Sequence, residues 1–130
     1  MSIILRTSNI IISGTTNLTL EKIKTIDTGE NNTLFLSEYG RVYGCGNNRY
    51  GQLGSTINND TDIANPVPTQ ITTTIGSLNI VQVACGGGAS LFLTDGGRVY
   101  SCGYNRYGNL GLIDNIWIHD VNKINNHLVS

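Results

Sequence analysis

The chain has 130 residues, a length that fits one domain. Eight Lys and Arg against nine Asp and Glu give a formal net charge of −1, so no strong electric field would attract nucleic acid or an anionic membrane. The N-terminal apolar runs are too short for the core of a signal peptide, and no run approaches the roughly 18 apolar residues of a membrane-spanning helix. We therefore expect a cytoplasmic or nuclear protein that binds neither nucleic acid nor membrane.

The first predicted element is a strand at residues 10–12, where three β-branched isoleucines stand in a row. A long internal repeat follows: residues 23–54 can be laid over residues 80–111 with a shift of 57, and 17 of the 32 positions are identical. Unrelated segments would share about two such positions. The similarity is densest between residues 40–54 and 97–111, where 12 of 15 pairs match. The chain is therefore built from two copies of one unit.

Each copy is predicted to form an antiparallel meander. In the second copy, residues 80–85, 90–94 and 98–102 are β-branched or aromatic runs of strand length, and the 3.6-residue period of a helix is absent. Between these runs, residues 86–88 and 95–97 are rich in glycine, which accepts the positive φ of tight hairpin turns.

A fourth strand is predicted at residues 67–71, because the preceding Pro66 is tolerated at the start or edge of a strand. Four strands in about 57 residues is the strand count of a propeller blade. Leu53 and Leu110 are expected to fill the blade core. Six repeated glycines are expected to let the backbone turn sharply or approach a neighbour. They are Gly46, Gly51, Gly54, Gly103, Gly108 and Gly111.

Residues 112–130 leave two alternatives open. A capping helix fits the spacing of five apolar residues that would lie near one face. They are Ile113, Trp117, Val121, Ile124 and Leu128. A strand fits equally well, because Ile116 and Ile118 alternate with Trp117, and it would be the first strand of a degenerate third blade.

The motif of the two copies, G-R-V-Y-x-C-G-x-N-R-Y-G-x-L-G, follows a V-x-V-A-C-G strand and an L-x-L-T strand in the second copy. It resembles the regulator of chromosome condensation repeat. That family often has His where this chain has Asn32 and Ala89, so no role of that His is carried over. It also commonly has Trp where Cys45 and Cys102 stand, a change that keeps an apolar residue in the layer.

The expected fold class is all-β: a partial β-propeller of about two four-stranded antiparallel blades, with a short helical or strand-like C-terminal tail. We expect one propeller-type repeat domain over residues 1–130, with repeat copies at 23–54 and 80–111 and a tail or degenerate third blade at 112–130. The resemblance implies seven blades in a ring, and closed propellers have at least about four. Two blades leave three explanations open: a fragment of a longer propeller, a homo-oligomer that completes a ring, or chain ends that cap the exposed faces.

No catalytic, cofactor-binding or metal-ligating residue is predicted, and no cofactor. Three cysteines without a C-x-x-C pair indicate reduced thiols, with Cys45 and Cys102 as structural residues. The glycines at residues 86–88 indicate a turn, since a phosphate-binding loop would need a following Lys. His119 and His127 are expected to be surface residues of the tail.

The repeated Arg49 and Arg106, each followed by a Tyr, are expected to tie down their own loops by hydrogen bonds. The alternative is a stacking surface for a partner.

The predicted function is a non-catalytic protein–protein interaction module of the regulator of chromosome condensation repeat type, whose partner the sequence does not identify. The resemblance implies an alternative, because founding members of the family promote nucleotide exchange on the small GTPase Ran and contact chromatin. Exchange activity would need a full ring. A third alternative is a truncated propeller without independent activity.

Overall fold

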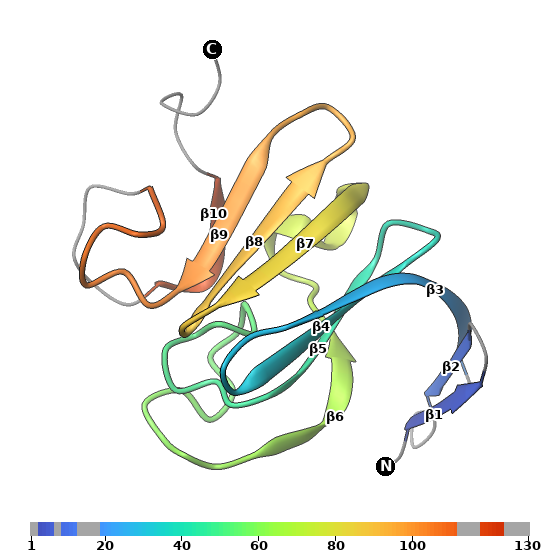
Figure 1. Cartoon of the computed structure of the whole chain (residues 1–130), viewed down its shortest axis with the longest axis horizontal. Coiled ribbons are helices and arrows are strands. Elements are labelled where there is room, and N and C mark those ends of the chain that lie inside the picture. Colours follow the sequence, from blue (N-terminus) through green and yellow to red (C-terminus); the bar gives the residue numbers. More distant parts are fainter. Residues whose placement is uncertain (1–2, 7–8, 13–18, 112–117, 124–130) are drawn as a thin grey trace.

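The computed structural model describes residues 3–6, 9–12, 19–111 and 118–123, and the side chains of residues 21–111. Ten strands and one short 3₁₀ helix are present in this part of the chain (Figure 1). The strands of the first sheet are β1 (Ile3–Arg6), β2 (Asn9–Ile12), β3 (Thr19–Thr28), β4 (Asn32–Ser37), β5 (Val42–Gly46) and β6 (Asn65–Gln70). The helix η1 (Thr74–Ser77) follows, and then the strands of the second sheet: β7 (Ile80–Gly86), β8 (Ala89–Thr94), β9 (Val99–Gly103) and β10 (Ile118–Lys123).

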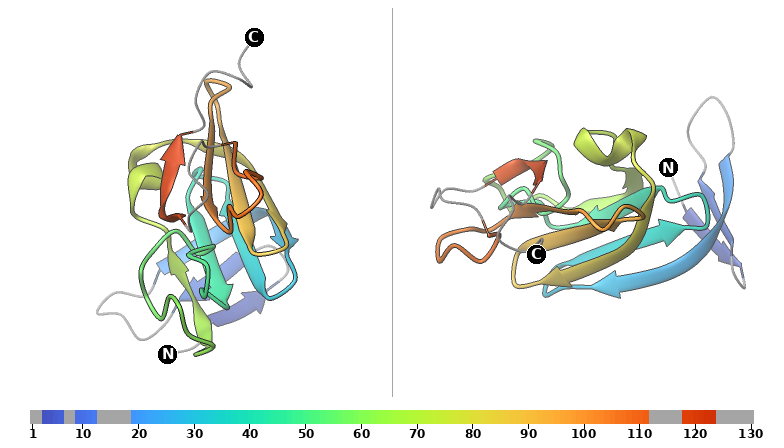
Figure 2. Two further views of the ribbon diagram at one scale, coloured as in Figure 1. Left: turned by 90° about the vertical axis from the view of Figure 1, so that its left-hand side faces the viewer. Right: turned by 90° about the horizontal axis from the view of Figure 1, so that it is seen from above.

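The first sheet contains the first blade, and its strands pair antiparallel in chain order from β1 to β6. The first part of β3 pairs with β2, from Thr19 to Lys22, and the part after Ile23 pairs with β4. A register shift between Ile23 and Thr25 separates the two parts. The predicted strand at residues 10–12 is thus confirmed as β2, and the β1–β2 hairpin extends from the end of β3 that lies far from the second sheet (Figure 2).

The second sheet is the second blade, and it has four antiparallel strands. Within the described residues, the tail is a strand and not a helix: β10 pairs with β9, with Ile118 opposite Gly103 and Lys123 opposite Tyr100. This part of the tail therefore supplies the fourth strand of the second blade, as β6 does in the first. Residues 112–117 and 124–130 lie outside the described residues.

The glycine-rich turns are confirmed. Gly88 has φ +82° in the two-residue turn between β7 and β8, and Gly97 has φ +80° between β8 and β9. All six repeated glycines also have positive φ. At Gly46 and Gly103 the reason is close approach as well, because a Cβ would collide with the carbonyl oxygen of Asn31 or Gly88, respectively.

The hydrophobic core lies between the two blades, where β7 packs across β3 and β4 (Figure 1). The first blade contributes Leu34, Leu36 and Val42, which are at most 2% exposed. The second blade contributes Ile80, Val83, Phe92, Tyr100 and Cys102, and the connection between the blades adds Ile71 and Ile75. Each blade thus covers the other, and the fold class of a partial propeller with four-stranded blades is confirmed.

Leu53 and Leu110 are buried as expected, at 6% and 0% exposure. In the described part of the chain, no helix is long and apolar enough to span a lipid bilayer.

Candidate functional site

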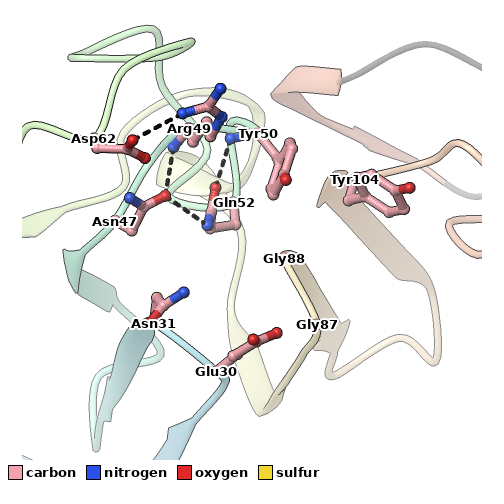
Figure 3. A pocket seen from close by; sticks show the side chains of 10 residues that line it. All are labelled: Glu30, Asn31, Asn47, Arg49, Tyr50, Gln52, Asp62, Gly87, Gly88 and Tyr104. Carbon is pink, nitrogen blue, oxygen red and sulfur yellow. Dashed lines mark hydrogen bonds and ion pairs between the residues drawn. The ribbon is translucent and has the colours of Figure 1, made fainter.

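A groove of about 460 Å³ lies between the blades, where their connecting loops meet (Figure 3). The first blade contributes the β3–β4 turn and the long β5–β6 loop, and the second contributes the β7–β8 turn and the segment after β9. Ten residues line the groove: Glu30, Asn31, Asn47, Arg49, Tyr50, Gln52, Asp62, Gly87, Gly88 and Tyr104. Its volume falls within the usual range for ligand pockets.

Arg49 is tied to its own loop, as the sequence favoured. Its Nη1 donates to Oδ2 of Asp62 over 2.9 Å, and this contact raises the pKa of the guanidinium. Its backbone N–H donates to Oδ1 of Asn47, which also accepts from Nε2 of Gln52. Oε1 of Gln52 in turn accepts from the N–H of Tyr50. These hydrogen bonds fix the conformation of the loop, and Asp62 neutralises the charge of Arg49.

Arg106, the repeat equivalent of Arg49, lies 6.0 Å from the ring centre of Tyr107, the residue that follows it. Tyr107 is 81% exposed. The repeat equivalent of Asp62 is His119, whose side chain lies outside those described. The arginine of the second blade thus makes a contact within its own segment that differs from the ion pair of the first.

Two repeated asparagines anchor the loops, and the sequence interpretation assigned them no role. Asn48 and Asn105 are fully buried, and their Oδ1 atoms accept from the N–H of Leu53 and Leu110 over 2.8 and 3.0 Å. Nδ2 of Asn48 also donates to the carbonyls of Ser55 and Ile57. Their identity in both copies was the signal that could have revealed this role.

Tyr50 and Tyr104 stand side by side in the groove, one from each blade. Their rings meet edge to face with centres 4.9 Å apart and planes inclined by 71°. Gly88 lies beneath them, and a Cβ there would come within 2.8 Å of Cδ2 of Tyr50 and 3.2 Å of Cβ of Tyr104. The absence of a side chain at Gly88 therefore sets how closely the tyrosines approach the turn.

A polar seam joins the blades beneath the groove. Oδ2 of Asp27 accepts from the N–H of Cys85 over 2.7 Å, across the two sheets. Nδ2 of Asn32 donates to Oγ of Ser90, and that hydroxyl donates to the carbonyl of Gln52 over 2.7 Å. Asn32, which stands where the resembled family often has His, thus holds one blade against the other.

The three cysteines lie in strands of the two blades. All three are free thiols; Cys102 is fully buried, whereas Cys45 and Cys85 are half-buried. Burial raises the pKa of Cys45, and burial together with the nearby Asp27 raises the pKa of Cys85 to about 11. A thiol with so high a pKa is a poor nucleophile near neutral pH.

A second surface feature is the side of the second blade that faces away from the first. Leu91, which is 36% exposed, lies there with the half-buried Leu93 and Val99. Together with Gln82, Val83, Ala84 and Phe92 they line a mostly apolar hollow of about 180 Å³. Leu91, Leu93 and Val99 are the repeat equivalents of Leu34, Leu36 and Val42. In the first blade, these equivalents are buried against the second blade. This open blade face therefore has the apolar composition of the surface that the first blade buries against its neighbour.

Neither metal nor nucleophilic chemistry was predicted from the sequence. Among the described residues, no group of three or more His, Cys, Asp or Glu side chains could hold a metal ion. The side chains of His119 and His127 lie outside the described set.

Two family models match the chain, and both describe the regulator of chromosome condensation (RCC1) repeat. One matches residues 39–93, and the other matches residues 23–52 and 80–109, the two copies of the internal repeat. The chain belongs to this repeat family. The RCC1 repeats thus cover both blades from β3 to the segment after β9.

Curated relatives agree with this assignment. A protein RCC2 homolog of Xenopus laevis is 45% identical over 83 residues, which are 64% of this chain and 15% of the relative. The ultraviolet-B receptor UVR8 of Arabidopsis thaliana is 33% identical over 112 residues, or 84% of this chain and 24% of the receptor. A human RCC1-like G exchanging factor-like protein is 37% identical over 92 residues, or 70% of the chain and 19% of the relative. The RCC1-repeat chain spans a quarter or less of each of these relatives.

Crystal structures share the fold. Prp20p from Saccharomyces cerevisiae, studied for its binding to Gsp1p and histones, superposes with a TM-score of 0.74 at 20% identity, over 93% of this chain and 35% of its own. Human WBSCR16 superposes with a TM-score of 0.70 at 22% identity, over 85% of this chain and 28% of its own. At this identity the likeness concerns the fold of the RCC1-repeat blades.

Proposed function

We propose that the chain is a non-catalytic protein–protein interaction module, and that its open blade face docks against a blade of a second copy. The main support is a comparison of equivalent positions in the two repeat copies. Leu34 and Leu36 are 0% exposed under the second blade, whereas their equivalents Leu91 and Leu93 remain in the open hollow. Apolar surface of this kind favours association, since its burial contributes roughly 25 cal/mol per Å².

The contact between the two blades of one chain supports a second copy as the partner at the open blade face. Val83 and Phe92 of the second blade pair across β7 and β8 and pack on the first blade. Their equivalents Ile26 and Phe35 pair in the same way across β3 and β4, on the side of the first blade turned away from the second. Ile26 is 57% exposed there, although Phe35 is buried with Tyr43. Ile26 of a second copy would thus pack on the open blade face in the same way as Val83 packs on the first blade within one chain.

Head-to-tail association of this kind adds blades in one direction, and several copies would complete a ring. In this proposal residues 1–130 act as one unit of two blades in the cytoplasm or the nucleus, with a protein as partner and with neither nucleic acid nor membrane. The names of the relatives, a receptor and an exchange-factor-like protein among them, support a regulatory binding role.

The test is a fluorescence anisotropy titration of labelled chain with unlabelled chain. We expect saturable binding by wild type and a loss of at least about tenfold in affinity for Leu91→Asp, because a carboxylate would have to be buried in an apolar contact. Ile63→Asp is the matched control, since Ile63 is an exposed apolar residue of the β5–β6 loop. Equal binding by Leu91→Asp and wild type, or no binding at all, would contradict the docking.

A second candidate function is regulation of a small GTPase by nucleotide exchange. It is supported by the human relative named as exchange-factor-like and by the fold shared with Prp20p, a protein studied for binding to Gsp1p. Its test is the release of a fluorescent guanine nucleotide from a Ran-type GTPase, with and without the chain. Faster release would favour this candidate, and an unchanged rate would leave the interaction module as the function.

A further inference from the structure

Several residues that line the groove between the blades stand at positions where the two repeats differ, although Arg49 and Tyr50 have identical counterparts in the second copy. Glu30 and Asn31 of the first blade correspond to Gly87 and Gly88 of the second, and all four line the groove. Tyr104 of the second blade corresponds to Asn47 of the first, and both line the groove. Positions that maintain the fold, such as the buried asparagines, are the same in both copies. The divergence indicates that the groove has a role that the repeat architecture does not require.

The groove contains one carboxylate, that of Glu30, beyond the ion pair of Arg49 and Asp62. Arg49 and Asp62 neutralise each other across 2.9 Å. Among the side chains that the structure describes, none forms an ion pair with the exposed carboxylate of Glu30. Figure 3 shows Glu30 beside the β7–β8 turn, with the two tyrosines across the groove from it. The groove therefore carries one uncompensated negative charge opposite an aromatic wall.

The side-chain oxygen atoms of Asn47 and Gln52 are already engaged within their own loop. Oδ1 of Asn47 accepts two hydrogen bonds, and Oε1 of Gln52 accepts one. Gly87 and Gly88 present backbone only; the space around Gly87 is open, whereas Tyr50 and Tyr104 lie against Gly88. A ligand would therefore meet the carboxylate of Glu30, the side-chain amide of Asn31 and the rings of Tyr50 and Tyr104.

From this arrangement we infer that the groove binds a guanidinium or ammonium group at the end of an arginine or lysine side chain of a protein partner. An aromatic wall attracts a cation, a carboxylate pairs with it, and a planar guanidinium can stack and pair at once. The edge-to-face contact holds both tyrosines in place before binding, so little side-chain freedom is lost. The inference rests on the proposed function in that the cation belongs to a protein.

The test uses the peptide acetyl-Gly-Arg-Gly-amide, titrated into the ¹⁵N-labelled chain and followed by amide chemical shifts. We expect saturable shifts at Gly87 and Gly88, and an affinity at least about fivefold weaker for the same peptide with neutral citrulline in place of arginine, because the charge-assisted contact is lost. Glu30→Gln should weaken arginine binding by a similar factor. Glu38→Gln is the matched control, because Glu38 is exposed and pairs with Lys22 outside the groove.

Three results would overturn the inference: no saturable shift at the turn, equal shifts with the citrulline peptide, or unchanged binding by Glu30→Gln. Saturable shifts at Gly87 and Gly88 with inorganic phosphate, and none with the arginine peptide, would instead make the groove an anion site. Peptide binding does not involve Leu91, so a failure here is distinguishable from a failure of blade docking.

Discussion

Asn48 shows how one side chain secures a whole loop. It is fully buried and makes three hydrogen bonds, one accepted from the N–H of Leu53 and two donated to the carbonyls of Ser55 and Ile57. We expect Asn48→Ala to lower the free energy of unfolding by about 2–3 kcal/mol, since each bond contributes about 1 kcal/mol and buried groups lose their partners. Urea unfolding measures this loss. Asn31→Ala, at an exposed position, should change stability by less than about 0.5 kcal/mol.

Cys85 should be slow to react in the folded chain. Burial raises its pKa to about 11, so at pH 8 its thiolate fraction is roughly two orders of magnitude below that of an unperturbed cysteine. The rate of iodoacetamide labelling at Cys85, followed by peptide mass mapping, should rise about tenfold per pH unit between pH 8 and 10. The chain in urea serves as the reference. Labelling of folded and unfolded chain at the same rate would refute the assignment.

The same shift has a consequence for stability. The pKa of Cys85 is higher in the folded than in the unfolded state, so the contribution of the neutral thiol is fully present below the unfolded pKa. It is lost as the pH rises towards 11. We expect the wild-type chain to lose more stability between pH 8 and 10.5 than Cys85→Ser does, as measured by urea unfolding at each pH. Parallel curves for the two proteins would contradict this.

At the scale of elements, the β7–β8 turn offers a matched pair of glycines. Gly88 has φ +82° and lies against the Tyr50 ring, whereas Gly87 has no positive φ and open space around its Cα. Gly88→Ala should therefore cost about 1–3 kcal/mol in strain and displaced tyrosines, and Gly87→Ala should cost less than about 0.5 kcal/mol. Thermal unfolding of both variants measures the difference. Equal melting temperatures would mean that the turn tolerates a side chain at either position.

The strands of the repeat could be predicted because their signals are local. Alternating β-branched and aromatic residues bounded by glycines located β7, β8 and β9 to within about one residue. The tail could not be decided, because the spacing of its apolar residues fits both a helix and a strand. Pairing with the free edge of β9 decides the conformation of Ile118–Lys123, and such a contact between distant segments leaves no local pattern.

The groove could be predicted only in part. The loop contact of Arg49 was predicted from its repetition, but the partner Asp62 stands 13 residues away within an irregular loop. The Tyr50–Tyr104 contact joins different blades and depends on the angle at which the sheets pack. Asn32 was interpreted only as a missing His, since its bond to Ser90 spans 58 residues of sequence.

At the scale of the whole molecule, the central claim is that two RCC1-repeat blades form one packed unit with an open face that docks against a second copy. Repeat units are stabilised by their neighbours, so the blade at each end of such a pair lacks one neighbour. In this chain the missing contact is on the side of Leu91, Leu93 and Val99.

The most direct measurement is the solution mass of the purified chain by light scattering across a range of concentrations, with Leu91→Asp alongside. The account predicts a mass that rises to a multiple of the 14.0 kDa protomer for wild type. Leu91→Asp should remain a folded monomer with cooperative thermal unfolding. A wild-type chain that stays monomeric at all concentrations would contradict the claim that this face docks against a second copy.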